Sequence, residues 1–138
     1  MDVARPAGAR PLSAAEEANR RLVLAMYEHV LMPLDSSRVD DFIAPGYVQH
    51  SPLAETGAAG LKHFLDWAKG SSPQATHAVK RVIVDGDMVV AHVHVVINPG
   101  ERGNAVIDIF RIADGRIAEH WDASQPIAAD PRNGNGVF

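Results

Sequence analysis

The stretch AVIDIFRIADGRIAEHWD, residues 105–122, contains two runs in which apolar and polar residues alternate, separated by the turn signal ADG. Alternation with a period of two is typical of half-buried β-strands, and Asp-Gly between two such runs indicates a β-hairpin. A three-residue loop with Gly115 in the left-handed conformation would pair Asp108 with His120. It would also place Asp108, His120 and Asp122 on the same face of the sheet. A two-residue loop would instead place Asp108 opposite Trp121. The spacing favours the three-residue loop.

The residues before this hairpin predict a second hairpin and a short strand. THAVKRVIV (residues 76–84) and MVVAHVHVVIN (residues 88–98) flank Asp85-Gly86, which is another two-residue turn signal. YVQH (residues 47–50) also alternates and is predicted to form a short strand.

Three helices are predicted in the N-terminal half. The first begins at a capping box formed by Ser13 and Glu16 and ends near Leu31. Its buried face is predicted from residues at helical spacing: Ala15, Ala18, Leu22, Ala25, Met26 and His29. The others cover residues 37–44 and 58–69. Helices followed by antiparallel strands predict an α+β fold, in which a curved sheet wraps over the first helix and encloses a pocket. We expect a single domain over residues 1–138, with a flexible lead (1–12) and an irregular tail (128–138).

Composition narrows the classes of function. The 138 residues suffice for one domain with a core, and the net charge is −4 with no cysteine, which excludes thiol catalysis and disulfides. Basic residues are scattered, and no apolar stretch approaches the ~20 residues of a membrane helix. We therefore expect a cytoplasmic protein that binds neither nucleic acid nor membrane.

Asp108 is the strongest candidate for a functional residue. It lies among Val106, Ile107, Ile109 and Phe110, and a lone carboxylate in such surroundings is costly unless it is paired or protonated. Groups of this kind are candidates for acid–base catalysis. The alternative is a salt bridge to Arg81 or Arg111 on the outer face of the sheet.

His92 and His94 are two residues apart, so both would point to one side of their strand. They could line the pocket, or they could lie on an outer face and meet solvent or a subunit. A third alternative is a metal site, because Gly86 followed by His92-x-His94 matches the opening of a cupin metal motif. The glutamate of that motif is displaced to Glu101 and no second histidine motif follows. We therefore expect no metal and no cofactor.

The remaining candidates are a strand-end histidine and four aromatic residues. His50 precedes a Ser-Pro turn and could project into the pocket or lie in a surface loop. Tyr27 could offer its hydroxyl to the pocket or pack in the core. The other three are predicted to form pocket walls, with core packing as the alternative: Phe64, Trp67 and Trp121.

YVQHSP (47–52), AHVHV (91–95), VIDIFRIADGRIAEHWD (106–122) and QPI (125–127) together resemble the SnoaL-like polyketide cyclase family. This family belongs to the nuclear-transport-factor-2-like superfamily, and the resemblance covers about residues 14–127. It implies a cone of three helices on a strongly bent sheet, and a homodimer formed through the outer sheet face, where Ile107 and Ile109 would lie. In the cyclases, an aspartate on this strand and a histidine on the preceding strand perform acid–base aldol chemistry. Asp108 and His94 match those positions.

The chain is also similar to the ketosteroid isomerases. In these enzymes a carboxylic acid at the position of Asp108 helps to form the oxyanion hole, and the general base occupies the position of His50. Their helix-one tyrosine falls close to Tyr27, and His120 and Asp122 match positions that line their pocket. The base position here holds histidine instead of aspartate.

These observations predict a small-molecule enzyme that performs cofactor-independent acid–base chemistry on an apolar carbonyl compound. Aldol cyclisation, isomerisation or a related enolisation or hydration would fit. His50 would transfer the proton, and Asp108, shared with His94, would stabilise the oxyanion. The residues expected to bind substrate are His92, His120, Asp122, Tyr27, Phe64, Trp67 and Trp121. The alternatives are a non-catalytic dimer that binds a small ligand and a histidine-ligated metal enzyme.

Overall fold

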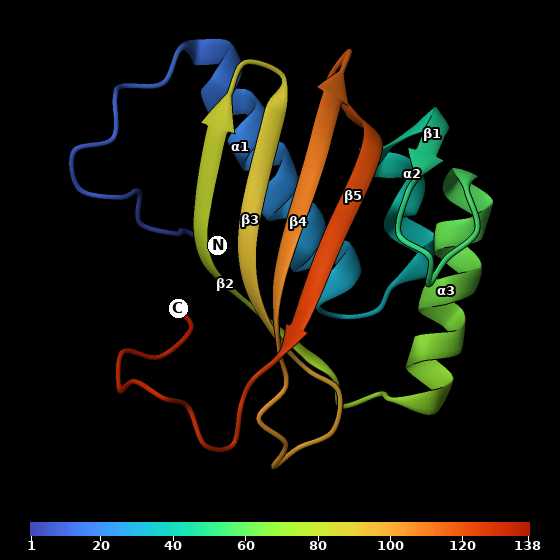
Figure 1. The fold of residues 1–138 in the computed structure, drawn as a ribbon. Helices are drawn as coiled ribbons and strands as arrows, with labels where there is room; N and C mark the ends of the chain where they lie inside the picture. The colour runs from blue at the N-terminus through green and yellow to red at the C-terminus, as the bar shows by residue number, and fades with distance from the viewer.

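Five strands form one sheet in the order β1-β5-β4-β3-β2 in the computed structural model, which describes residues 1–138 (Figure 1). β2 to β5 pair antiparallel, and β1 pairs parallel with β5. The fold class is therefore α+β, as the sequence predicts. The sheet is open, with β1 and β2 as its edges, and it does not close into the predicted cone. The strands are β1 (Ile43–Gln49), β2 (Thr76–Asp85), β3 (Met88–Val96), β4 (Asn104–Ala113) and β5 (Arg116–Pro126).

Three α-helices lie on one side of this sheet or beside it: α1 (Ala14–Met26), α2 (Val39–Phe42) and α3 (Gly57–Ser71). α1 crosses behind β2, β3 and β4, whereas α3 lies beside β1 (Figure 1). The predicted capping box is confirmed, because Ser13 and Glu16 each bond to the other's backbone N–H. A π-helical turn, Tyr27–Leu31, extends α1, and a 3₁₀ turn, Ser36–Arg38, precedes α2.

The predicted buried face of α1 is only partly correct: Met26 is buried and Leu22 and Ala25 pack against the core, but Ala15, Ala18 and His29 are exposed. The residues of its buried side include Arg20, Val23 and Val30, whereas His29 is exposed. The reason is that the polar residues on this side have partners. Arg20 donates a hydrogen bond to the carbonyl of Val3, and Glu16 accepts one from the backbone of Gly86 at 2.9 Å. Charged groups with such partners can be buried, so hydrophobic periodicity alone did not identify the whole buried face.

The predicted register of the hairpin at residues 105–122 is also wrong. Asp114 and Gly115 both have positive φ, 51° and 72°, so they form a two-residue turn of type I′. A register shift follows between Arg111 and Ile112, which leaves an extra residue on β5. Asp108 therefore pairs with Asp122, and His120 pairs with Phe110. Turn and bulge together restore the side-chain alternation, so Asp108, His120 and Asp122 still share one face.

We call the sheet face that packs on the helices the inner face and the opposite one the outer face. Val89, Ala91 and Val93 of β3 have no exposed surface, and cross-strand pairing places Ala91 beside Asp108 on the inner face. His92 and His94 alternate with these residues, so they lie on the outer face, as do Ile107 and Ile109.

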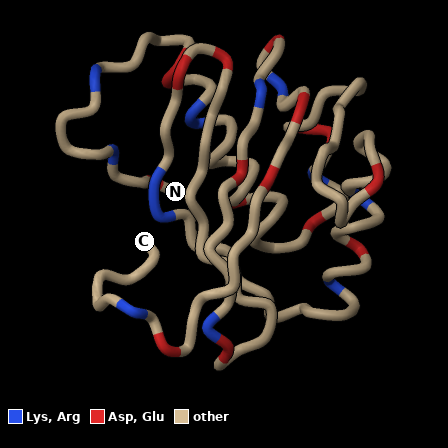
Figure 2. The backbone as a smooth tube through the Cα atoms, in the orientation of Figure 1, with Lys and Arg blue, Asp and Glu red and all other residues tan.

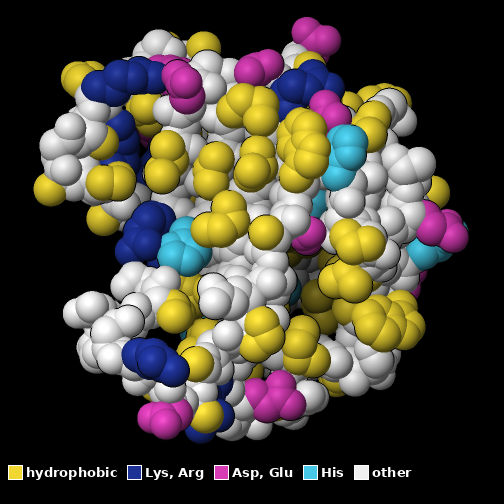
Figure 3. Space-filling view, in the orientation of Figure 1, with side chains coloured by type: hydrophobic (Ala, Val, Ile, Leu, Met, Phe, Trp, Pro, Cys, Tyr) yellow, Lys and Arg dark blue, Asp and Glu magenta, His cyan; other side chains and the backbone are white.

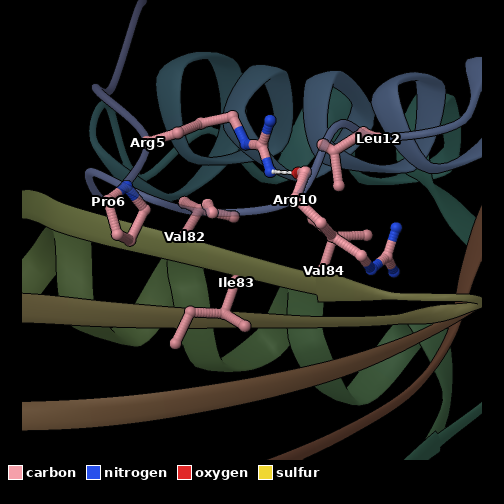
Figure 4. A pocket seen from close by; sticks show the side chains of 8 residues that line it. Arg5, Pro6, Arg10, Leu12, Val82, Ile83 and Val84 are labelled. Carbon is pink, nitrogen blue, oxygen red and sulfur yellow. Dashed lines mark hydrogen bonds between the residues drawn. The ribbon is translucent and has the colours of Figure 1, made fainter.

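Neither end of the chain forms a helix or strand, and both lie near β2 (Figure 1). Residues 5–12 and β2 line a cavity of about 230 Å³, which Val82 and Val84 face and from which Ile83 points away (Figure 4). At the other end, the ring of Phe138 lies 5.0 Å from the rings of both His92 and His94. The two outer-face imidazoles thus form the support for an aromatic ring of the tail.

Basic and acidic residues are interspersed over the sheet and the helices, and neither sign gathers on one side (Figure 2). None of the helices has the length and apolar character required to span a bilayer.

Candidate functional site

A buried carboxylate–imidazole pair lies at the centre of the inner face. Asp108 on β4 and His120 on β5 are 8% and 9% exposed, and Asp108 Oδ1 is 2.8 Å from His120 Nε2. His120 is diagonal to Asp108 in the register, which brings its ring back over the carboxylate. The Phe110 ring stacks on the His120 ring, with 4.9 Å between the ring centroids. The pair is therefore held by packing as well as by its hydrogen bond.

Tyr27 supplies the second hydrogen bond to Asp108. Its side chain is fully buried, and its hydroxyl donates to Asp108 Oδ2. Tyr27 is the first residue of the π-helical turn, and such turns occur often at functional sites because they redirect side chains within a helix. Burial, and then the charge of Asp108, raise the pKa of Tyr27 well above its ordinary value. Its hydroxyl therefore keeps its hydrogen and remains a donor.

Gln49 on β1 holds the other side of His120. His120 Nδ1–H donates to Gln49 Oε1 at 2.6 Å, and the Gln49 amide Nε2 donates to the Tyr47 hydroxyl at 3.0 Å. Burial raises the pKa of Tyr47 above its ordinary value, and the charges of Asp108 and Asp122 act in the same direction. A continuous chain of hydrogen bonds thus runs from Tyr47 through Gln49, His120 and Asp108 to Tyr27.

This chain fixes where the protons lie. The backbone N–H of Ser51 donates to Gln49 Oε1 at 3.1 Å, so this oxygen, and not the amide nitrogen, faces His120. A carbonyl oxygen only accepts, so His120 Nδ1 must carry a hydrogen. The short contact between His120 Nε2 and Asp108 then requires one proton between them, on either the imidazole or the carboxyl group. The pair is an acid that holds one transferable proton.

Asp122 adds a second carboxylate to the site. It lies opposite Asp108 in the register, is partly exposed, and accepts no hydrogen bond from another side chain. Its carboxylate, that of Asp108 and a nitrogen of His120 lie within 4.8 Å of one another, so the three could offer ligands to a cation. Such binding would have to break the contact between Asp108 and His120. The arrangement otherwise combines a buried acid and an open base, which suits proton transfer.

The structure does not bring His94 or His92 to this site. Both are on the outer face, because Ala91 and not a histidine lies opposite Asp108. His94 donates to the carbonyl of Arg102 at 2.7 Å, and His92 accepts from Arg81 at the same distance. The assignment of His94 as the partner of Asp108 is therefore wrong, as is the pairing of Asp108 with an arginine. The cupin-like metal alternative gains no support, because His92 and His94 do not belong to the group of carboxylates and imidazoles that lie close enough together to hold an ion.

His50 and Trp121 are on the outer face as well. His50 Nε2 donates to Glu119 Oε2 at 2.6 Å, and the His50 ring stacks on Trp121 at 4.8 Å. Gln49 is the β1 residue opposite His120, so its neighbour His50 points the other way. His50 therefore cannot exchange a proton with a substrate at Asp108, and Trp121 is not a pocket wall.

Of the two α3 aromatics, Phe64 packs partly against the core, whereas Trp67 is 66% exposed. Trp67 extends into solvent because the helix is amphipathic and its outer side has no neighbouring element. Phe64 alone remains in a position to border the inner face.

Sequence reasoning missed Gln49, Tyr47 and His77. In YVQH, alternation places Tyr47 and Gln49 on one face of the strand and Val48 and His50 on the other. This pattern could have identified Tyr47 and Gln49 together, but His50 was assigned to the pocket instead. His77 lies on the inner face of β2, where it pairs with Val95. Its Nδ1 is buried and has no hydrogen-bond partner.

The inner face is covered at the end of the sheet that carries Val89. It is partly exposed at the end that carries His77 and Asn104, except at Val93, which is fully buried. Val89, Phe110 and His120 are buried, whereas residues nearer the other end of the strands are partly exposed. Figure 3 shows the surface hollowed between the lower part of β5 and α3. The partly exposed lower residues are His77, Val79, Val95, Asn104, Val106 and Asp122.

The fold and the buried acid on its inner face define a class of small α+β proteins with the NTF2-like architecture. A family model described as the SnoaL-like domain matches residues 23–120, which is more than half of the chain. The protein therefore belongs to the SnoaL-like family. No curated protein matches the sequence.

Solved structures agree with this assignment. TsrD from Streptomyces laurentii is 25% identical, with a TM-score of 0.62 over 83% of this chain and 91% of that one. A putative SnoaL-like polyketide cyclase from Jannaschia sp. CCS1 is 20% identical, with a TM-score of 0.70 over 84% and 91%. An NTF2-like protein from Mesorhizobium loti is 17% identical, with a TM-score of 0.68 over 84% and 97%. The last two show the fold alone.

Proposed function

We propose that this protein is a cofactor-independent enzyme that enolises an apolar carbonyl compound by acid–base chemistry. The observation that supports this most is the hydrogen-bond chain that leaves one proton between Asp108 and His120. The nearby Asp122 provides a carboxylate that is free to accept a second proton.

In the proposed reaction, the Asp122 carboxylate removes a proton from the carbon beside the carbonyl group. The proton shared by Asp108 and His120 passes to the carbonyl oxygen as the negative charge develops there, and an enol results. Gln49 keeps the His120 ring oriented, and Tyr27 supports the Asp108 carboxylate as its proton leaves. Return of a proton at another carbon would give an isomer, and attack of the enol on a second carbonyl would give an aldol product.

The exchange of α-hydrogens for deuterium in D₂O tests this directly, with 2-tetralone and 1-indanone as probes followed by NMR. The wild type should accelerate exchange, because Asp122 can trade its captured proton with solvent. Asp108→Asn should reduce the acceleration by about 100-fold or more, the typical loss for one oxyanion-stabilising donor. Glu119→Gln is the matched control, since Glu119 also contacts a histidine but on the outer face, and exchange should stay at the wild-type rate.

A different result would favour the binding alternative. If a ketone binds to the wild type, Asp108→Asn weakens that binding, and its α-hydrogens exchange only at the buffer rate, the site holds a ligand without turnover. An Asp108→Asn variant with wild-type exchange would remove Asp108 from the reaction altogether.

We also propose that the protein is a homodimer formed through the outer face. Ile83, Val90, Ile109 and Trp121 are successive cross-strand neighbours and form an apolar row, with Ile83 54% exposed. Apolar side chains gather over β2 to β5 in this view (Figure 3). Light scattering should give twice the chain mass for the wild type and the single mass for Ile109→Lys. The control variant Trp67→Lys, on the exposed side of α3, should have the same mass in solution as the wild type. A monomeric wild type would refute the proposal.

A further inference from the structure

Both members of the Asp108–His120 pair are oriented by a hydrogen bond to a residue outside the pair. The Tyr27 hydroxyl donates to Oδ2 of Asp108, so Oδ1 is the oxygen that faces His120 Nε2, at 2.8 Å. Gln49 Oε1 accepts the hydrogen of His120 Nδ1, so loss of the shared proton leaves a lone pair on Nε2. Histidines that bind metals nearly always donate their other ring nitrogen to such an acceptor, and carboxylates that bind metals are also hydrogen-bonded.

Asp122 places a third ligand atom beside these two. Its carboxylate lies within 4.8 Å of both, and its side chain is partly exposed and accepts no hydrogen bond from another side chain. In a tetrahedral zinc site, ligand atoms about 2.1 Å from the ion are about 3.3 Å from one another. Asp108 and His120 therefore need to separate only slightly, and a rotation of the Asp122 side chain completes the set. Because the ion takes the place of a proton, the site needs no cavity of the size of an organic ligand.

The charges of the three side chains favour a divalent ion. The proton between Asp108 and His120 leaves that pair neutral overall, so Asp122 carries the net charge of the group. A divalent ion that replaces the proton meets two carboxylates and a neutral imidazole, and the charges then cancel, which favours a buried site. One nitrogen and two oxygen ligands suit zinc, whereas Mg²⁺ and Ca²⁺ require more oxygen ligands than these residues offer.

The pair on the outer face shows that a carboxylate–imidazole contact alone is not sufficient. His50 Nε2 is 2.6 Å from Glu119 Oε2, but the other oxygen of Glu119 accepts from the Arg111 guanidinium at 2.9 Å. A cation at this carboxylate repels a metal ion. The close group of three possible ligands forms on the inner face and does not include this pair.

We propose that Asp108, His120 and Asp122 form an inhibitory zinc site, in which Zn²⁺ replaces the shared proton. This rests on the function proposed above and adds regulation to the same site. The step is an exchange: bonds form from the ion to Asp108 Oδ1 and His120 Nε2, and the proton between these atoms leaves to solvent. The bound ion stops the reaction, because Asp122 no longer accepts a proton and the pair has none to give. The reaction itself uses no metal.

Calorimetric titration of zinc chloride into the protein without a histidine tag, at pH 6.5 in two buffers of different ionisation enthalpy, measures affinity and released protons together. The wild type should bind one Zn²⁺ and release about one proton. Asp122→Asn should bind at least about 100-fold more weakly, because even a residue that only orients a ligand contributes 10–100-fold. Glu119→Gln, in the outer pair, is the matched control and should bind zinc as tightly as the wild type.

Absence of binding would overturn the proposal, as would binding that releases no proton. Binding that is unchanged in Asp122→Asn would place the ion elsewhere and overturn it as well. Saturating zinc should reduce the deuterium exchange of 2-tetralone to the buffer rate, and EDTA should restore it, whereas faster exchange with zinc would contradict inhibition. The calorimetry needs no substrate, so a metal-free wild type that binds zinc but catalyses no exchange would refute the proposed function and leave the zinc site in place.

Discussion

Each face of the sheet carries one carboxylate–histidine pair. On the inner face, Asp108 and His120 have side chains that are each 11% exposed, whereas on the outer face Glu119 and His50 are 20% and 41% exposed. The distances are similar, 2.8 Å and 2.6 Å. Contact geometry therefore does not separate the two pairs. The two pairs differ in their burial and in the residue that contacts each histidine in addition to its carboxylate, which is Gln49 for His120 and Trp121 for His50.

The outer pair has a charged neighbour and a stacking partner. Arg111 donates to Glu119 at 2.9 Å, and the hydrogen bonds from His50 and Arg111 lower the pKa of Glu119. Water can replace any of these contacts, so the pair is expected to contribute little to stability. The inner pair is enclosed and linked on both sides, so its members depend on each other.

The largest expected difference between the faces is in stability. His120→Ala leaves the Asp108 carboxylate buried with only Tyr27 as a partner, and should lower the free energy of unfolding by about 3 kcal/mol. His50→Ala removes a half-exposed ring on the other face and should have a much smaller effect. Urea denaturation at pH 7 measures both. Equal losses for the two variants would show that burial does not distinguish the pairs.

The second largest expected effect concerns which ring nitrogen of His120 carries the hydrogen. In the wild type, ¹⁵N NMR should show a hydrogen on Nδ1, since Gln49 Oε1 can only accept. Gln49→Leu removes that acceptor, so the hydrogen should distribute between the two ring nitrogens, with a stability loss of about 1 kcal/mol.

Gln49→Glu serves as the control, because a carboxylate oxygen also accepts and should retain the Nδ1 hydrogen. A wild-type ring with its hydrogen on Nε2 alone would refute the proton assignment on which the proposed reaction depends.

This comparison also explains what the sequence could reveal. The helices, the five strands and the shared face of Asp108, His120 and Asp122 follow from periodicity and turn residues, which are local properties. The assignment of faces for His50, His92 and His94 depends on which residue of each strand lies opposite Asp108 or His120. That is set by the pairing register, and a shift by one residue exchanges the faces.

The bulge after Arg111 shows the same limit within one hairpin. The turn has two residues, which alone would have placed Asp108 beside Trp121, yet the extra residue on β5 restores Asp122. No local signal in the sequence announces this bulge. The predicted three-residue loop reached the correct face with the wrong cross-strand partners.

A smaller effect is expected in the pH dependence of stability. The pKa of His77 is lowered from 6.5 in the folded protein, so the unfolded chain binds the proton more readily. Stability should therefore fall as the pH drops below 6.5, and His77→Phe should remove part of that slope. Glu119, with its pKa lowered from 4.5, contributes stability that is lost only below pH 4.5. Thermal unfolding from pH 8 to about pH 3 separates the two windows. A slope above pH 5 that is unchanged in His77→Phe would show that His77 does not cause it.

The smallest effect compares two histidines whose pKa values are both lowered, chiefly by burial. The second cause differs in sign: the charge of Asp108 raises the pKa of His77, whereas that of Arg81 lowers the pKa of His92. Asp108→Asn should therefore lower the pKa of His77 further, and Arg81→Gln should raise that of His92. NMR titration of both rings measures these opposite shifts. Because each face would respond only to its own substitution, a shift of His92 in Asp108→Asn would show that the two faces are not electrostatically separate.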